Sequence, residues 1–162
     1  MHPLALFLVL VLIMLANGTP VVVKRLFGDR FAYPLDGNIV FFDGRPLFGS
    51  SKTVRGVVLA LIVTAAGAPL LGLSMTVGVV VAATAMAGDV FSSFVKRRLG
   101  LPPHSRATGL DQIPESLFPL LACRSTLGLS AVDIAAGVVI FLIGEILASR
   151  ALFRLRVRDR PY

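Results

Sequence analysis

Charged residues and cysteine are both scarce in this chain of 162 residues. Only 15% of the residues are charged, whereas 56% are hydrophobic and the mean hydropathy is +0.84. A soluble domain carries about 25% charged residues, so the composition argues against one and predicts an integral membrane protein with a single helical domain. The one cysteine, Cys123, excludes an intramolecular disulfide, and its apolar neighbours predict an inert core residue.

Several signatures of other functions are absent as well. No internal repeat is seen, which argues against a transporter built from repeated halves. The first cations follow the apolar run 3–23 and do not precede it, so this run predicts a retained span and not a signal peptide. Residues 49–56 lack the glycine spacing of a Walker A loop. The net charge of +7 does not indicate nucleic-acid binding, because the cations flank the apolar runs.

The apolar runs predict an all-α membrane protein with five spans, at residues 3–23, 56–73, 75–95, 113–129 and 131–153. A span needs about 20 residues, and the run from Gly56 to Val95 is long enough for two. The polar segments 24–55 and 96–112 would then lie on the same side of the membrane. All but one of the 16 lysines and arginines fall on that side, which predicts an outer N-terminus, an inner C-terminus and a cytoplasmic active-site face.

The exception to this charge asymmetry is Arg124. We expect Arg124 to extend to the outer surface or to pair with Asp133, as long side chains near helix ends do. Glu145 lies within the last apolar run, either as an internal helix–helix partner or as a residue behind a site. Near the inner end of the first span, Asn17–Pro20 is expected to loosen the last helical turn or to line a site.

The polar segment 24–55 carries two local signals. Residues 39–48 predict a cytoplasmic β-hairpin, because Asp43-Gly44 suits a type I′ turn, and we expect it to pack on the membrane domain. Further along, Ser51 or Thr53 could cap the next helix. Lys52 and Arg55 would make that helix N-terminus a phosphate site, although both cations could equally serve only to set topology.

Two acids that bracket a basic cluster are the strongest functional signal. Asp89 is the only ionisable residue between Gly56 and Val95, and a carboxylate at membrane depth is unfavourable unless it serves a site. The cations at 96–98 follow, and then Asp111 in the next polar loop. Basic clusters commonly end a transmembrane helix, but that role explains neither acid. The topology brings candidate groups from three segments to one face: Asp36, Asp43, Lys52, Arg55, Asp89, Lys96, Arg97 and Asp111.

The order of these residues resembles the GD…S..KR..G…LD pattern of membrane cytidylyltransferases that make CDP-activated lipids. The matching residues are Gly88-Asp89, Ser93, Lys96-Arg97, Gly100 and Leu110-Asp111. The sequence Lys52-Thr53-Val54-Arg55-Gly56, with Asp36-Gly37, Asp43-Gly44 and Asp111-Gln112, is similar to CDP-archaeol synthases, whereas phosphatidate enzymes tend to carry KT-x-EG. The third acid of their DR-x-D pattern is missing after Asp111, and Glu115 is a candidate substitute.

The resemblance implies transfer of CMP from CTP to a lipid phosphate, giving CDP-lipid and pyrophosphate. Asp89 and Asp111 would bind Mg²⁺ and be catalytic together with Lys96. The nucleotide and phosphate groups would be bound by Lys52, Thr53, Arg55, Ser93, Arg97 and Asp43. An unsaturated archaeal ether lipid phosphate is the favoured substrate. The alternatives are a phosphatidate cytidylyltransferase that makes CDP-diacylglycerol, and a non-enzymatic small transporter or scaffold. Membrane lipid is an expected partner, nucleic acid is not, and small-residue helix faces would allow a homodimer.

Overall fold

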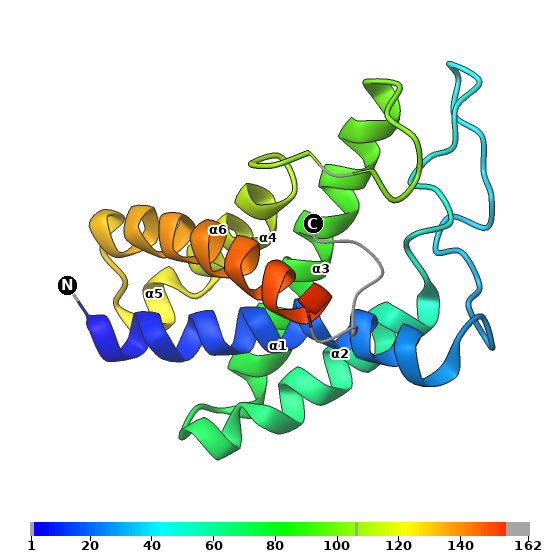
Figure 1. Ribbon diagram of the computed structural model, residues 1–162. Coiled ribbons are helices and arrows are strands. Elements are labelled where there is room, and N and C mark those ends of the chain that lie inside the picture. Colours follow the sequence, from blue (N-terminus) through cyan, green and yellow to red (C-terminus); the bar gives the residue numbers. More distant parts are fainter. Residues whose placement is uncertain (1, 106, 155–162) are drawn as a thin grey trace.

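The computed structural model describes residues 2–105 and 107–154, and this part of the chain is all-α (Figure 1). Arg106 and the arginines after residue 154, which contribute to the predicted charge asymmetry, lie outside the described residues. The helical elements are α1 (Pro3–Phe27), α2 (Val54–Gly67), the short 3₁₀ helix η1 (Pro69–Leu71), α3 (Met75–Arg98), α4 (Gln112–Ala122), α5 (Arg124–Leu127) and α6 (Ala131–Arg154).

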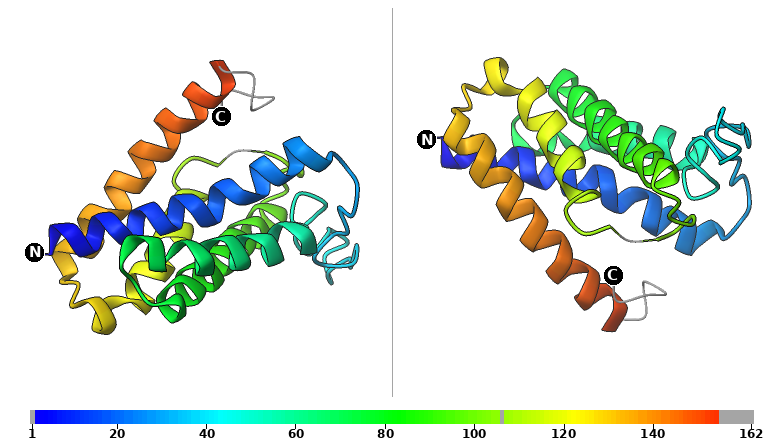
Figure 2. Two further views of the ribbon diagram at one scale, coloured as in Figure 1. Left: turned by 90° about the horizontal axis from the view of Figure 1, so that it is seen from below. Right: turned by 90° about the horizontal axis from the view of Figure 1, so that it is seen from above.

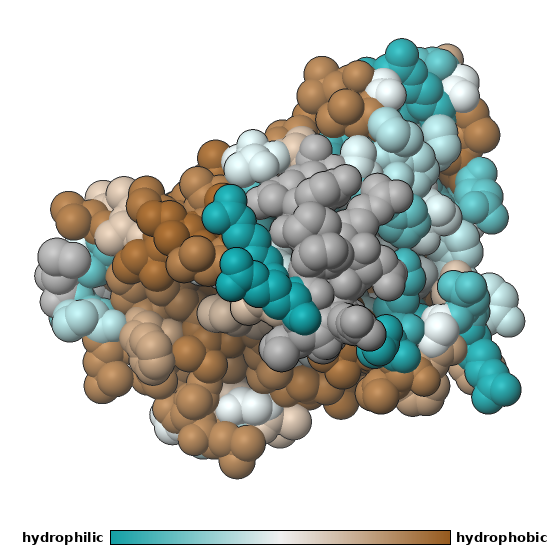
Figure 3. Space-filling model, in the orientation of Figure 1, coloured by the Kyte–Doolittle hydropathy of each residue, from teal (hydrophilic) through white to brown (hydrophobic). Residues whose placement is uncertain are grey.

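Four stretches in the described residues are long and apolar enough to cross a membrane: Pro3–Phe27, Val54–Leu71, Met75–Arg98 and Ala131–Ala151. The protein is therefore a multi-pass helical membrane protein. On the face seen in Figure 3, hydrophobic residues cover the end of the molecule that carries the N-terminus. Hydrophilic residues gather toward the opposite end, where the loop 28–53 lies.

The segment predicted as a single span at 113–129 is broken into two helices. α4 has 11 residues, which at 1.5 Å per residue is about 16 Å, roughly half of the hydrocarbon thickness of a bilayer. Cys123 interrupts the helix with ψ of 2°, and α5 ends after one turn at Gly128, whose φ is +65°. The polar residues Arg124, Ser125 and Thr126 follow the break directly, and Gly128 ends α5, so the sequence does carry a local signal that the prediction of one continuous span did not use.

α1 lies at the centre of the bundle and packs against α2, α3, α4 and α6. Its most buried residues recur at helical spacing, and Val9, Leu12, Ile13 and Ala16 are fully buried. The expected loosening at Asn17–Pro20 does not occur, because α1 continues as a helix to Phe27. Pro20 lies inside this helix, although a proline normally removes a helix hydrogen bond. Its ring packs against α2, since a Cβ added to Gly56 would lie 3.3 Å from the Pro20 ring.

The two polar loops meet at one end of the bundle, which we call the loop end. Residues 28–53 connect α1 to α2, and residues 99–111 connect α3 to α4 (Figure 2). Arg45 holds the first loop against the end of α3, since its guanidinium donates to the carbonyl oxygen of Arg98 at 2.6 Å. At the opposite end, the His2 amide donates to Asp133 at the start of α6.

The predicted β-hairpin at residues 39–48 is wrong in its detail, because the described residues contain isolated bridges and no strand. One bridge joins Val40 to Pro46, and the Phe41 amide donates to the Arg45 carbonyl at 2.8 Å. The Leu47 amide donates to the Ile39 carbonyl at 2.9 Å, but the ladder ends there because the Phe48 amide donates to the Asp36 side chain. The turn is not type I′ either, since Gly44 has a positive φ (75°) but Asp43 does not.

The closest approach of α3 and α4 depends on Gly88. A Cβ added there would lie 2.7 Å from the backbone nitrogen of Glu115, and backbone atoms cannot move aside as a flexible side chain can. We therefore expect Gly88→Ala to destabilise the protein by about 1–3 kcal/mol. Gly144→Ala is the matched control, because no described atom lies within 4 Å of the added Cβ. Thermal unfolding in detergent measures both variants, and equal midpoints would contradict this account.

Candidate active site

The first element of the site is an ion pair between Lys52 and Asp89. It joins the residue before the N-cap of α2 to the middle of α3. The two side chains are 17% and 20% exposed. Burial opposes the charge on Lys52, but the carboxylates of Asp89, Glu115 and Asp111 outweigh it and raise the pKa of Lys52. Lys52 therefore remains a cation at neutral pH.

A second ion pair, between Lys96 and Asp111, lies two turns further along α3. The Lys96 Nζ is 2.6 Å from Asp111 Oδ1 and also donates to the Ser105 carbonyl at 3.2 Å. The other Asp111 oxygen accepts the Ala107 amide at 2.9 Å. The last turn of α3 thus fixes the loop that carries Asp111. Asp111 precedes α4, but its side chain makes no cap hydrogen bond to that helix in the described structure.

Glu115 is the acid that the sequence suggested without assigning a role. It is 9% exposed, and its carboxyl group lies within hydrogen-bonding reach of Asp89. The close packing at Gly88 brings the two acids together. Lys52 supplies a cation beside these two carboxyl groups, since it contacts Asp89 and lies close to Glu115. In the sequence, Glu115 was the candidate substitute for the third acid that is missing after Asp111.

Ser93 and Arg97 lie on the same face of α3 as Asp89, at intervals of four residues. Both are buried, at 1% and 3% exposure. Arg97 donates to the Pro102 carbonyl at 2.9 Å. Its Nε and Nη1 atoms and the Ser93 hydroxyl have no hydrogen-bond partner among the described residues. Buried polar groups are normally satisfied, so these atoms indicate a place where a ligand with acceptor oxygens would bind.

Three other predicted site residues lie outside this cluster of charges. Thr53 caps α2, because its hydroxyl oxygen accepts the Gly56 amide at 3.2 Å. Arg55 donates to the backbone carbonyls of Gly28, at 3.0 Å, and Arg30. Asp43 is 3.2 Å from the Arg98 guanidinium. Their contacts hold the loop 28–53 against α2 and α3.

Asp36 organises the loop from within. Its carboxylate accepts the backbone N–H groups of Asn38, Phe48 and Gly49 at 2.8–3.0 Å. Burial alone would raise the pKa of Asp36, but these three donors outweigh it and hold the pKa below the usual range. The loop is therefore stabilised by Asp36 above pH 4, and this contribution is lost as the pH falls through the lowered pKa.

Gln112 had no predicted role, and it connects the site to α6. Its Nε2 donates to Glu145 Oε2 at 2.5 Å, while its Oε1 accepts the Gly109 amide at 2.8 Å. Glu145 is thus an internal helix–helix partner, one of the two roles expected for it. The sequence singled out Gln112 only as part of the Asp111-Gln112 match to the family pattern, which gave it no role of its own.

Each ion pair joins a residue of α3 to a residue of a neighbouring loop, and the unsatisfied donors of Ser93 and Arg97 lie on the same helix, so the arrangement suits the binding of anionic groups. Fold and site together define a multi-pass helical membrane protein with a buried cluster of paired charges. Comparisons with known proteins narrow this class. The sequence profile described as CarS-like, CDP-archaeol synthase, matches residues 4–162. The chain belongs to the CDP-archaeol synthase family, as the sequence pattern predicted.

Individual relatives agree with this membership. The chain is 34% identical over 155 residues to a CDP-archaeol synthase of Sulfurisphaera tokodaii, covering 92% of this chain and 90% of the relative. It is 34% identical over 156 residues to that of Pyrobaculum calidifontis, covering 91% and 90%. A solved structure, described as an intramembrane enzyme for archaeal membrane lipid biosynthesis, matches with a TM-score of 0.71 and 27% identity, covering 85% of this chain and 90% of that one. The predicted enzyme class, a CTP-dependent cytidylyltransferase, is confirmed by the family.

Proposed function

We propose that this protein transfers CMP from CTP to an unsaturated archaeal ether lipid phosphate at the loop end of the bundle. The observation that carries the proposal is the pair of lysine–aspartate contacts, Lys52–Asp89 and Lys96–Asp111, beside the unsatisfied donors of Ser93 and Arg97. In the reaction, an oxygen of the lipid phosphate attacks the α-phosphorus of CTP. The bond to the β-phosphate oxygen breaks, and pyrophosphate leaves.

The chain's own residues would contribute alignment and charge neutralisation. A phosphate monoester is already anionic at neutral pH, so its attack requires no strong base. The difficulty is to bring two polyanions together, and positioned cations reduce their repulsion. Lys52, Lys96 and Arg97 would bind the phosphate oxygens, and the Ser93 hydroxyl would donate to one of them. Burial of these groups strengthens such contacts, because competing water is excluded.

Magnesium is the proposed metal, and the donor set fits it. Mg²⁺ binds through one or two carboxylates together with substrate phosphates and water. Asp89 and Asp111 are its proposed ligands, and in the described structure each carboxylate is neutralised by a lysine. Within residues 2–105 and 107–154, no three His, Cys, Asp or Glu side chains gather as a metal cluster, so the substrate phosphates would complete the ligand set. When bound, the ion would neutralise charge on the reacting oxygens.

We further infer five crossings, with the N-terminus outside and the loop end in the cytoplasm. The broken segment α4–α5 supports the additional crossing, because its two ends lie at opposite ends of the bundle. It begins beside Lys96 at the loop end. It ends at Gly128, where an added Cβ would lie 3.8 Å from the side chain of His2. The cations at the inner end of α1 and α3 support the orientation. A homodimer is also proposed, because Ala83 and Ala87 form an exposed small-residue face on α3.

The activity is tested with purified protein, CTP and Mg²⁺, by measuring pyrophosphate release. We expect release with a geranylgeranyl ether lipid phosphate and much less with phosphatidate at the same concentration. A preference for phosphatidate would support the acyl-lipid alternative. No release with any lipid phosphate would instead support a non-enzymatic membrane protein.

Lys52→Ala separates a phosphate-binding role from a topological one. Loss of a charge-assisted hydrogen bond of about 1.5–3 kcal/mol should weaken CTP binding roughly tenfold or more. Orientation in the membrane should not change, because the other inner cations remain. The control is Lys24→Ala, which removes an exposed cation in the last turn of α1. CTP affinity and protease accessibility are measured for both variants. Unchanged affinity with inverted orientation would show that Lys52 only sets topology.

A further inference from the structure

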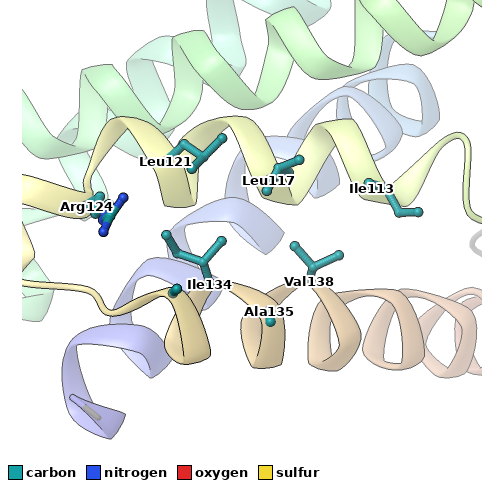
Figure 4. A pocket seen from close by; sticks show the side chains of 8 residues that line it. Ile113, Leu117, Leu121, Arg124, Ile134, Ala135 and Val138 are labelled. Carbon is teal, nitrogen blue, oxygen red and sulfur yellow. The ribbon is translucent and has the colours of Figure 1, made fainter.

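A groove lies between α4 and α6, outside the cluster of ion pairs. Its volume is about 370 Å³, and it is lined almost entirely by apolar side chains. Figure 4 shows Leu117 and Leu121 on α4 facing Ile134 and Val138 on α6, with Arg124 at the α5 end. Arg124 is the one charged residue of the lining.

The groove exists because α6 diverges from the rest of the bundle. Figure 2 shows α1 and α6 starting together at one end and separating along their length. The most apolar window of α6 is 22% buried within the protein, compared with 50% for α3. Leu121 remains 49% exposed on the groove wall. An apolar groove at membrane depth favours an acyl or isoprenoid chain as its occupant, because water finds no polar partners there.

Arg124 gives the groove a charged end. The alternative that Arg124 pairs with Asp133 is not realised, since the Asp133 oxygens accept from His2 and from the backbone and hydroxyl of Ser130 at 2.6–3.2 Å. Among the described residues, no ion pair of Arg124 is found. A guanidinium that is exposed beside an apolar groove matches a phosphate headgroup, which it binds in a two-pronged geometry.

We propose that this groove is a second lipid site, which binds an anionic phospholipid with its headgroup at Arg124 and one chain between Leu117 and Val138. The length of the groove fits this occupant. From Ile113 to Arg124 the helical rise is about 16 Å, close to half of the hydrocarbon thickness and so to the depth of one leaflet. The headgroup would lie at the end opposite Lys52 and Asp89. The bound lipid is therefore not in a reacting position, and it would fill the gap that separates α6 from α4.

Tryptophan fluorescence tests the proposal directly, because the chain contains no tryptophan. Leu121→Trp places a single reporter in the groove wall, and Val58→Trp places a control reporter on exposed α2. The protein is reconstituted in phosphatidylcholine vesicles that contain brominated phosphatidylglycerol or brominated phosphatidylcholine. We expect brominated phosphatidylglycerol to quench the groove reporter at about fivefold lower mole fraction than brominated phosphatidylcholine. One cation near an anionic headgroup contributes about 1 kcal/mol, which corresponds to this ratio. The α2 reporter should show no preference.

Three variants of the reporter protein, one of them a control, test whether the preference arises at this site. Arg124→Gln should abolish the headgroup preference, whereas Lys24→Gln, at the far end of α1, should retain it. Ala135→Phe, which fills the groove, should reduce quenching by both lipids. Equal quenching by the two lipids in the reporter protein, or a preference that persists after Arg124→Gln, would overturn the proposal. Unchanged quenching after Ala135→Phe would place the lipid outside the groove and would overturn it as well.

Discussion

Asp89→Asn is expected to lower CTP turnover by at least about 100-fold, the usual effect of removing a key electrostatic group from an active site. The amide keeps the shape of the side chain but supplies no charge to Mg²⁺ and none to Lys52. The fold should persist, because Lys52 is also close to the carboxylates of Glu115 and Asp111. Turnover in detergent and the unfolding temperature are the two measurements.

Asp29→Asn is the control for this variant, since Asp29 is an exposed acid in the loop after α1. It should turn over CTP at the wild-type rate. Near-normal activity of Asp89→Asn would remove Asp89 from the site. Loss of activity together with loss of folding would show a structural role for the Lys52–Asp89 pair and would leave the catalytic assignment without support.

The second large effect is expected for Asp89 and Asp111 together. If both acids bind the same metal cluster, removing either disables it, and the double variant should be no worse than the worse single variant. The alternative is that Asp111 caps α4, a role whose loss would cost only about 1 kcal/mol of stability. The described geometry does not favour that alternative, because the Asp111 side chain bonds Lys96 and the preceding loop, not the amides of α4.

A double-mutant cycle on CTP turnover measures this coupling. It is run across a range of Mg²⁺ concentrations with Asp89→Asn, Asp111→Asn and the double variant, each checked for folding. Defects that multiply would show two independent roles. A normal magnesium dependence of Asp111→Asn would remove Asp111 from the proposed metal ligands.

The residues of the charged cluster were predictable from the sequence, but their pairing was not. A lone acid in an apolar run and cations at the membrane surface are local signals, so Asp89 and Lys96 could be selected directly. Which lysine meets which acid depends on how α3 packs against α4 and the loops. That packing depends in turn on Gly88, whose neighbours Pro114 and Glu115 are more than 25 residues away in the chain.

The structure separates Arg55 from Lys52, which the sequence grouped together. Arg55 lies three residues after Lys52, and both were assigned to the phosphates. Lys52 precedes the N-cap of α2, whereas Arg55 is already in its first turn, so the two side chains leave the chain in different directions. Arg55 consequently bonds the backbone after α1, whereas Lys52 reaches α3.

The helix break at Cys123 has a practical consequence for labelling experiments. The thiol is 1% exposed, in the core between α4 and α5, and a thiolate must be accessible to react with a maleimide or a spin label. The natural chain can therefore serve as its own unreactive background. A cysteine introduced at Phe42, which is 99% exposed at the loop end, or at exposed Ser125 near the opposite end, would be the preferred point of modification. Membrane-impermeant reagents applied to sealed vesicles would then report the sidedness of each end.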